Sequence, residues 1–222
     1  MKQVCFGVDI GGTTVKLGLV SQEGDLLEKR EFPSSRDLAV TFDDIAANIR
    51  QVMDSFPDAM CIGAGVGVPG PVLEQSVVRG CVNLGWGDVD VARELGSRAG
   101  MPVKVANDAN LAALGELWRG AGENLRSVLL MTIGSGIGAG LVVDGNVVSG
   151  GHGAAGEIGH MTVVPDGRLC KCGRKGCLER YASARGLVQT FQEASELPDL
   201  DRSCFSGIEP AHETDALAVF RA

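Results

Sequence analysis

The chain has 222 residues, 45% of them hydrophobic, and a formal net charge of −8. This length is enough for one large domain or two small ones. An acidic chain is a poor partner for nucleic acids, whose phosphate backbones require clustered lysine and arginine. The sequence has no secretory segment and no apolar run of membrane length. We therefore expect a cytoplasmic protein that binds neither nucleic acid nor membrane.

The first half of the chain predicts three antiparallel strands followed by alternating helices and strands. Short apolar runs separated by glycine-containing turns indicate hairpins, and apolar residues at helical spacing indicate the first helix. The run at 60–68 is apolar throughout and predicts a strand buried on both faces. In chain order, the expected elements are strands at 3–9, 15–20 and 26–32, a helix at 37–55, a strand at 60–68, a helix at 89–99, a strand at 103–106 and a helix at 109–119.

The three-strand pattern restarts at Ser127, with strands expected at 127–133, 138–143 and 147–149. Helical stretches follow near 178–192 and 214–221. We expect a duplicated α/β fold of two βββαβαβα domains, at residues 1–120 and 121–222. The second copy lacks its later strands and helices, so we expect a fragment or an incomplete gene product.

Four potential metal ligands lie in one short glycine-rich segment: His160, Cys170, Cys172 and Cys177. One imidazole and three thiolates make a closed tetrahedral set, which suits a structural zinc and not a catalytic one. Gly173 and Gly176 would let the backbone curl so that the thiolates face one metal. The alternative is a disulfide cluster, which an odd count of seven cysteines disfavours. We expect the remaining cysteines to be reduced thiols: Cys5, Cys61, Cys81 and Cys204.

Two glycine-rich turns occupy matched places in the repeated unit, D-I-G-G-T-T-V-K from Asp9 and T-I-G-S-G-I-G-A-G from Thr132. Backbone N–H groups in such turns can cradle phosphate oxygens, and Asp9 can hold Mg²⁺ through water. The alternative is two independent hairpins, but the duplication favours two turns that bind the same polyphosphate from either side. The residues of this expected site are Asp9, Gly11, Gly12, Thr13, Thr14, Lys16, Thr132, Gly134, Ser135 and Gly136.

Two further turns follow buried strands. In N-D-A-N (107–110), Asp108 can act as the general base that a kinase requires on a substrate hydroxyl. Its alternative role is an N-cap of the following helix. In V-P-G-P-V (68–72), the rigid turn at Gly70 can contact a sugar through main-chain groups or can be purely structural.

With these motifs in this order, the chain resembles the bacterial ROK-family sugar kinases of the glucokinase-like type, which have an actin/hexokinase-like (ribonuclease H-like) fold. The matching segments are D-I-G-G-T, G-V-P-G-P-V, N-D-A-N, I-G-S-G-I-G-A-G, G-E-I-G-H and C-K-C-G-R-K-G-C-L-E. The resemblance covers essentially the whole chain, and the cysteine-rich segment is its most specific part. The chain lacks the later G-G-G-type segment that contacts adenosine in the family. We therefore expect this chain to bind sugar better than ATP.

The resemblance implies an ATP-dependent hexose kinase that phosphorylates glucose to glucose 6-phosphate, with Asp108 as the base. It implies that Asn107, Glu157, His160 and Glu179 bind sugar hydroxyls, that the His/Cys cluster holds zinc, and that the protein forms a homodimer. Fructose, mannose, allose and N-acetylmannosamine kinases share these motifs. Two alternatives are an inactive sugar-binding remnant and a ROK-type sugar-sensing regulator. Since only eight residues precede Asp9, we expect no DNA-binding domain ahead of it.

Overall fold

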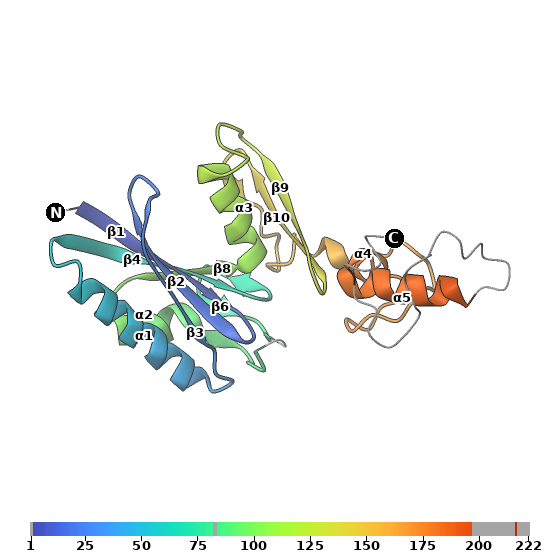
Figure 1. Ribbon diagram of the computed structural model, residues 1–222, viewed down its shortest axis with the longest axis horizontal. Coiled ribbons are helices and arrows are strands. Elements are labelled where there is room, and N and C mark those ends of the chain that lie inside the picture. Colours follow the sequence, from blue (N-terminus) through green and yellow to red (C-terminus); the bar gives the residue numbers. More distant parts are fainter. Residues whose placement is uncertain (1, 82–83, 197–215, 217–222) are drawn as a thin grey trace. The chain divides into compact units, whose positions relative to one another are not determined.

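The computed structural model describes residues 2–81, 84–196 and 216. The chain divides into two compact units (Figure 1). The first unit comprises Met1–Leu130 and Gly140–Ala155, and the second comprises Met131–Ala139 and Gly156–Ala222. The expected domain boundary near residue 120 stays a prediction.

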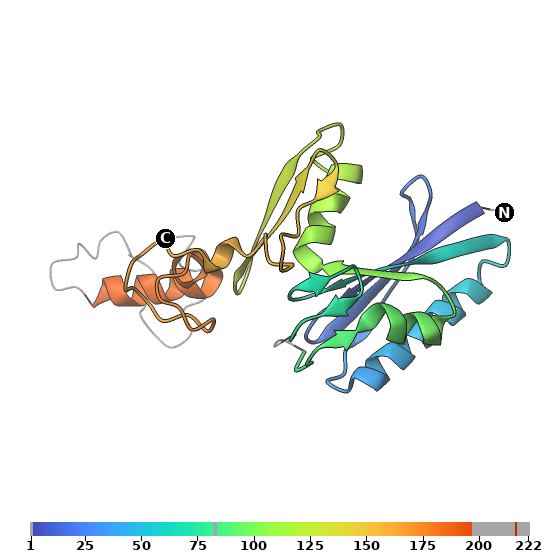
Figure 2. The same ribbon diagram turned by 180° about the vertical axis from the view of Figure 1, so that it is seen from behind.

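The first unit is built on a five-stranded mixed sheet with the order β3-β2-β1-β4-β8. Antiparallel pairing joins β1 to β2 and β2 to β3, whereas β1–β4 and β4–β8 are parallel. Helices α1 (Leu38–Asp54) and α2 (Val91–Ala99) cover one face of the sheet, and α3 (Asp108–Arg119) lies on the other side (Figures 1 and 2). The strands are β1 (Lys2–Ile10), β2 (Thr14–Ser21), β3 (Leu26–Pro33), β4 (Ala59–Val68) and β8 (Val103–Asn107). The expected βββαβαβα order is confirmed here.

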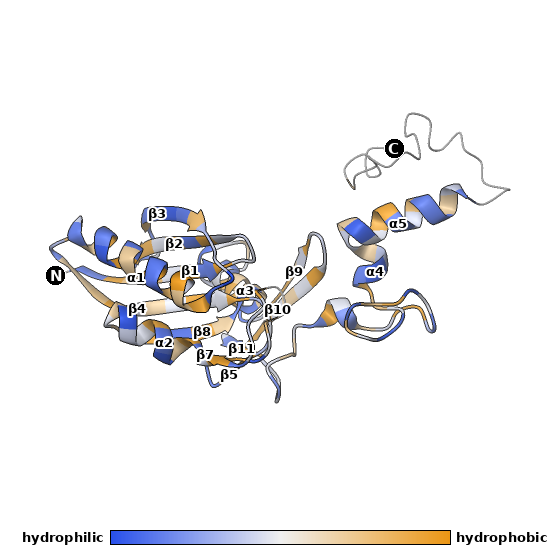
Figure 3. Ribbon diagram, turned by 90° about the horizontal axis from the view of Figure 1, so that it is seen from below, coloured by the Kyte–Doolittle hydropathy of each residue, from blue (hydrophilic) through white to orange (hydrophobic). Residues whose placement is uncertain are grey.

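The core of this unit lies between the sheet and the α1–α2 layer. Alternate residues of β1 point into it, because successive side chains of a strand face opposite sides. Helix α1 contributes an apolar stripe at helical spacing, and its bands of hydrophobic and hydrophilic residues are visible in Figure 3. The α1 residues that are at most 1% exposed are Thr41, Phe42, Ile45, Ala46, Ile49 and Val52. Asp37 begins the helix by accepting the Ala39 N–H at 2.9 Å.

Three two-residue strands form a small sheet that the sequence pattern did not predict, with the order β5-β6-β7. They are β5 (Val72–Leu73), β6 (Val77–Val78) and β7 (Val89–Asp90). The expected helix at 89–99 therefore begins two residues late, at Val91, because Asp90 caps it by accepting the Arg93 N–H at 3.1 Å. The expectation that 60–68 is buried on both faces is also wrong at its start, where Met60 and Ile62 are 41% and 54% exposed.

The restarted strand pattern is confirmed as a second, three-stranded sheet with the order β11-β10-β9. Its strands are β9 (Val128–Ile133), β10 (Ile137–Val143) and β11 (Asn146–Val147). Gly140 of β10 packs directly against α3, where a Cβ would overlap the Ala109 carbonyl oxygen. No side chain other than hydrogen fits at this contact.

The second unit contains a cysteine-rich loop and two short helices. A 3-10 turn covers Ile158–His160, and the expected helix at 178–192 is present as α4 (Glu179–Ala182) and α5 (Ala184–Ser195). The two helices are separated at Ser183, whose hydroxyl caps α5 by accepting the Gly186 N–H at 3.1 Å. The expected helix at 214–221 and Cys204 lie outside the described residues. No helix in the described part of the chain is long and apolar enough to cross a membrane.

Candidate functional site

The polar residues of the first unit gather where three parallel strands end. The strand register aligns Asp9 of β1 with Gly67 of β4, and Val68 of β4 with Asn107 of β8. The turn at Gly70 and the start of α3 at Asp108 follow these strand ends directly. The carboxyl ends of parallel strands are the usual place for ligand binding in α/β sheets.

The structure separates the two roles considered for Asp108. Asn107, and not Asp108, is the N-cap of α3: its Oδ1 accepts the Asn110 N–H at 3.2 Å. The N-cap alternative for Asp108 is therefore wrong. Asp108 directly follows the carboxyl end of β8, and its residue is exposed. Protein atoms around its carboxyl displace water and raise its pKa, and the negative charge of Asp9 raises this pKa further. A carboxylate with a raised pKa is better suited to take a proton from a hydroxyl.

Asn107 also fixes the neighbouring turn. Its Nδ2 donates to the Gly70 carbonyl oxygen at 3.3 Å, and Gly70 has a φ of 107°, a conformation that favours glycine. Asn110, which the sequence reasoning missed, is only 5% exposed, and its Oδ1 has no hydrogen-bond partner within the described ranges. Asn107 and Asn110 line a cavity of about 800 Å³ in this unit. The second asparagine of the N-D-A-N motif could have indicated a polar residue in this cavity.

The two glycine turns are confirmed as hairpin connections, one in each unit. In the first, the Gly11 N–H donates to the Thr14 carbonyl at 2.9 Å, Gly12 and Thr13 are exposed, and Lys16 lies opposite Asp9 in the β1–β2 register. In the second, Thr132, Gly134 and Ser135 are exposed, and the Ala184 N–H at the start of α5 donates to the Gly134 carbonyl at 2.9 Å. Their phosphate-binding role stays a prediction.

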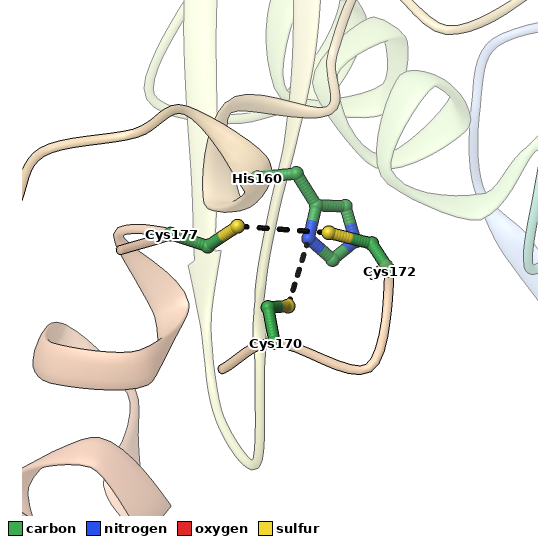
Figure 4. A group of neighbouring side chains, drawn as sticks. All are labelled: His160, Cys170, Cys172 and Cys177. Atoms are coloured by element: carbon green, nitrogen blue, oxygen red, sulfur yellow. Dashed lines mark hydrogen bonds between the residues drawn. The ribbon is translucent and has the colours of Figure 1, made fainter. Parts of the chain in front are cut away.

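The four expected metal ligands come together in the second unit (Figure 4). Their ligand atoms all lie within 4.8 Å of one another. His160 Nδ1 is 3.6 Å from Cys170 Sγ, and Cys172 Sγ is 3.6 Å from Cys177 Sγ. A tetrahedral zinc with Zn–S bonds of about 2.3 Å would place two sulfurs about 3.8 Å apart. Since all three cysteines are free, the disulfide alternative is wrong for this cluster, and the donor set fits zinc.

The loop that carries the cysteines turns where the sequence predicts. Gly173 and Gly176 have φ values of 86° and 74°. The thiols differ in acidity: the Arg174 N–H lowers the pKa of Cys172 to about 6, whereas burial raises the pKa of Cys170 to about 12. Because only a thiolate ligates a metal, metal binding here must displace a proton from Cys170.

Two carboxylates flank the His160 ring. Glu157 Oε2 is 3.8 Å from His160 Nε2, and Glu179 Oε1 is 3.7 Å from His160 Nδ1. The Cys170 thiol donates to Glu179 Oε1 at 3.2 Å. The structure thus brings Glu157, His160 and Glu179 together in the second unit. In the first unit, it places Asp9, Gly70, Asn107 and Asp108 at or just after the carboxyl ends of the parallel strands. His160 turns Nδ1 toward the cysteines and leaves Nε2 on the Glu157 side.

Comparisons with known proteins identify the family of the chain. The ROK family model matches residues 5–219. A glucokinase of Halalkalibacterium halodurans is 40% identical over 195 residues, which cover 84% of this chain and 58% of that protein. A xylose repressor of Bacillus subtilis is 31% identical over 189 residues, covering 84% of this chain and 49% of the repressor. The chain therefore spans about half to three fifths of the length of these relatives.

Solved structures extend the similarity to the fold. The crystal structure of a ROK family glucokinase from Streptomyces griseus, in complex with glucose and AMPPNP, matches with a TM-score of 0.73 and 34% identity, over 92% of this chain and 65% of that one. The expected α/β, actin/hexokinase-like fold class is confirmed. Because sequence and structure comparisons find the same family over nearly all of its length, the chain belongs to the ROK family.

Proposed function

We propose that this chain is the greater part of an ATP-dependent hexose kinase, which transfers the γ-phosphoryl group of ATP to glucose and yields glucose 6-phosphate. The observation that carries the proposal is Asp108. Asp108 is not the N-cap of α3, it directly follows the carboxyl end of β8, and its pKa is raised, which supports a role as general base. The names of the related glucokinases support the same reaction.

The proposed roles follow from the chemistry of each side chain. Asp108 accepts the proton of the attacking sugar hydroxyl. Asn107 and the main chain at Gly70 hydrogen-bond neighbouring hydroxyls, while Glu157, His160 and Glu179 bind the others. A sugar presents many hydroxyls, so its pocket needs carboxylates and amides as partners. Positioning of the γ-phosphoryl group and the hydroxyl supplies most of the catalysis in such transfers.

We assign the bound groups in the same way. His160 Nδ1 and the thiolates of Cys170, Cys172 and Cys177 fit a structural zinc. When bound, it fixes the remaining ring proton on Nε2, which makes Nε2 a donor toward the sugar. The exposed carboxylate of Asp9 suits water-mediated Mg²⁺. The proposed ATP phosphate site comprises Asp9, Gly11, Gly12, Thr13, Thr14, Lys16, Thr132, Gly134, Ser135 and Gly136. A homodimer is part of the proposal and is tested by sedimentation.

The test is the Asp108→Asn variant, with Asp58→Asn at an exposed position outside the site as the matched control. Loss of a general base costs on the order of 10²–10⁴-fold in rate. We expect glucose phosphorylation, followed by a coupled assay, to fall by this factor while glucose affinity, measured by calorimetry, stays nearly intact. An Asp108→Asn protein that kept most of its kcat would refute the assignment.

A sugar-sensing regulator is the second candidate, favoured by the similarity to xylose repressors. Hexose binding alone fits both candidates, so the discriminating measurement is ADP production that depends on hexose. Binding without turnover in the wild-type chain would favour a sugar sensor or an inactive sugar-binding fragment over the kinase.

A further inference from the structure

Arg168 lies two residues before the first cysteine of the cluster, and its side chain is only 11% exposed. An arginine is rarely this buried unless its donors are paired. The partners of its guanidinium are the Glu193 carboxylate, the carbonyl oxygens of Arg180 and Gly186, and the Thr190 hydroxyl. All of these partners belong to α4 or α5.

The contacts form a fork that no other side chain could make. Arg168 Nη1 donates to the Arg180 carbonyl at 2.6 Å and to Thr190 Oγ1 at 3.0 Å, and Nε donates to Glu193 Oε2 at 3.1 Å. Nη2 also donates to Glu193. The guanidinium stacks 4.5 Å from the centre of the Tyr181 ring. A lysine has a point charge and cannot reproduce this planar set of donors.

The backbone of Arg168 is fastened to the same elements. Its N–H donates to the Tyr181 hydroxyl at 2.8 Å, and its carbonyl accepts the Gly176 N–H at 2.9 Å. Arg168 therefore connects three parts of the second unit: the loop that carries the cysteines, α4 and α5.

Helix α4 is held by its neighbours, among them Met161, whose carbonyl accepts the Leu178 N–H at 2.9 Å. It has four residues, far fewer than a helix needs to persist by itself in water. Its first residue is Glu179, which accepts the Cys170 thiol and lies beside His160. Arg168 holds the carbonyl of the next residue, Arg180, so the direction of the Glu179 carboxylate follows from where Arg168 holds α4.

We propose that Arg168 is a positioning residue for Glu179 and thereby sets the affinity for hexose. The inference rests on the proposed function, in which Glu179 binds a sugar hydroxyl. Arg168 itself touches no substrate. Removing a partner that orients a metal ligand typically costs about 10–100-fold in metal affinity or activity, and we expect a loss of the same order for hexose binding here.

The test is a double-mutant cycle in the full chain, with glucose as the ligand and calorimetry as the measurement. Arg168→Lys should weaken glucose binding about 10–100-fold, and Glu179→Gln should weaken it as well. In the Glu179→Gln background, Arg168→Lys should cause little further loss, because residues that act through one another are not additive. Arg93→Lys, at a 74% exposed position outside this network, is the matched control.

Two further measurements keep the result interpretable. Zinc content should stay near that of the wild type in Arg168→Lys, since Arg168 contributes no ligand atom. Glu193→Gln removes the carboxylate partner from a half-exposed position, where misfolding is not expected, and should weaken glucose binding in the same direction by a smaller factor.

The outcomes separate the two proposals. Additive losses in the cycle, or unchanged glucose affinity in both Arg168→Lys and Glu193→Gln, would overturn the positioning role while leaving the kinase proposal intact. A wild-type chain that binds no hexose would overturn the proposed function and the Arg168 assignment with it.

Discussion

The two units of this chain are stabilised by different means. The first unit has a continuous apolar core, with fully buried side chains contributed by β1, β2, β4, α1, α2 and β8. Among the described residues of the second unit, the buried apolar side chains are few: Ile137, Ala139, Cys170, Cys177 and Phe191. The second unit contains instead the His/Cys cluster and the polar network of Arg168. We therefore expect burial of apolar surface to drive folding in the first unit and metal binding to organise the second.

Metal removal should give the largest difference in stability between the two units. Structural zinc contributes about 10–16 kcal/mol of apparent binding free energy in zinc-finger peptides, where it is coupled to folding. We expect near-stoichiometric zinc in the purified protein. Chelation should raise amide hydrogen exchange across residues 156–196, while the β1 and α1 amides stay protected.

The matched variants are Cys172→Ser in the cluster and Cys5→Ser outside it. Cys172→Ser should lose the metal and reproduce the effect of the chelator, and Cys5→Ser should keep its zinc. Protection of the second unit that survived chelation would show that its few apolar contacts suffice.

A core truncation tests the other half of the comparison. Phe42 on α1 is 0% exposed, and its ring packs edge-to-face against the Trp86 ring with the two ring centroids 5.5 Å apart. Phe42→Ala should destabilise the first unit by about 3–5 kcal/mol, through lost burial and the cavity that remains. Urea unfolding followed by hydrogen exchange of β1 would measure this.

Val40→Ala on the same helix is the control for Phe42→Ala. Val40 is 46% exposed, so its truncation should change stability by no more than about 0.5 kcal/mol. Equal effects of the two substitutions would mean that the α1–sheet interface does not dominate the stability of this unit.

The same contrast explains what the sequence could predict. Periodicity located α1 to within a residue at each end, since Leu38–Asp54 was expected at 37–55. The cluster was predictable because His160 and the cysteines are close in the chain. The strands β5 to β7 have two residues each, too few to give a periodic signal.

Other features depend on contacts that local patterns do not encode. Asn107 and Asp108 are both good N-caps, so the sequence could not decide between them. Met60 and Ile62 are apolar yet exposed, because burial depends on what covers the strand. Nothing in the sequence links Arg168 to Glu193, 25 residues away, since their contact requires the path of the chain through α4 and α5.

The smallest predicted effect concerns how the first unit tunes Asp108. The proposed base works only when deprotonated, so kcat/KM should fall as the pH drops through the pKa of Asp108 in the free enzyme. Since surrounding protein atoms and then Asp9 raise that pKa, the acid limb should lie at a higher pH than an ordinary aspartate would give. Asp9→Asn removes one negative charge, so the acid limb of the normalised kcat/KM profile should move to lower pH, even if the variant is slower overall. Glu74→Gln, at an exposed turn of the same unit, should leave the limb in place. If the acid limb were unchanged in Asp9→Asn, Asp108 would not be the titrating base. The group that titrates in the acid limb would then be expected in the second unit.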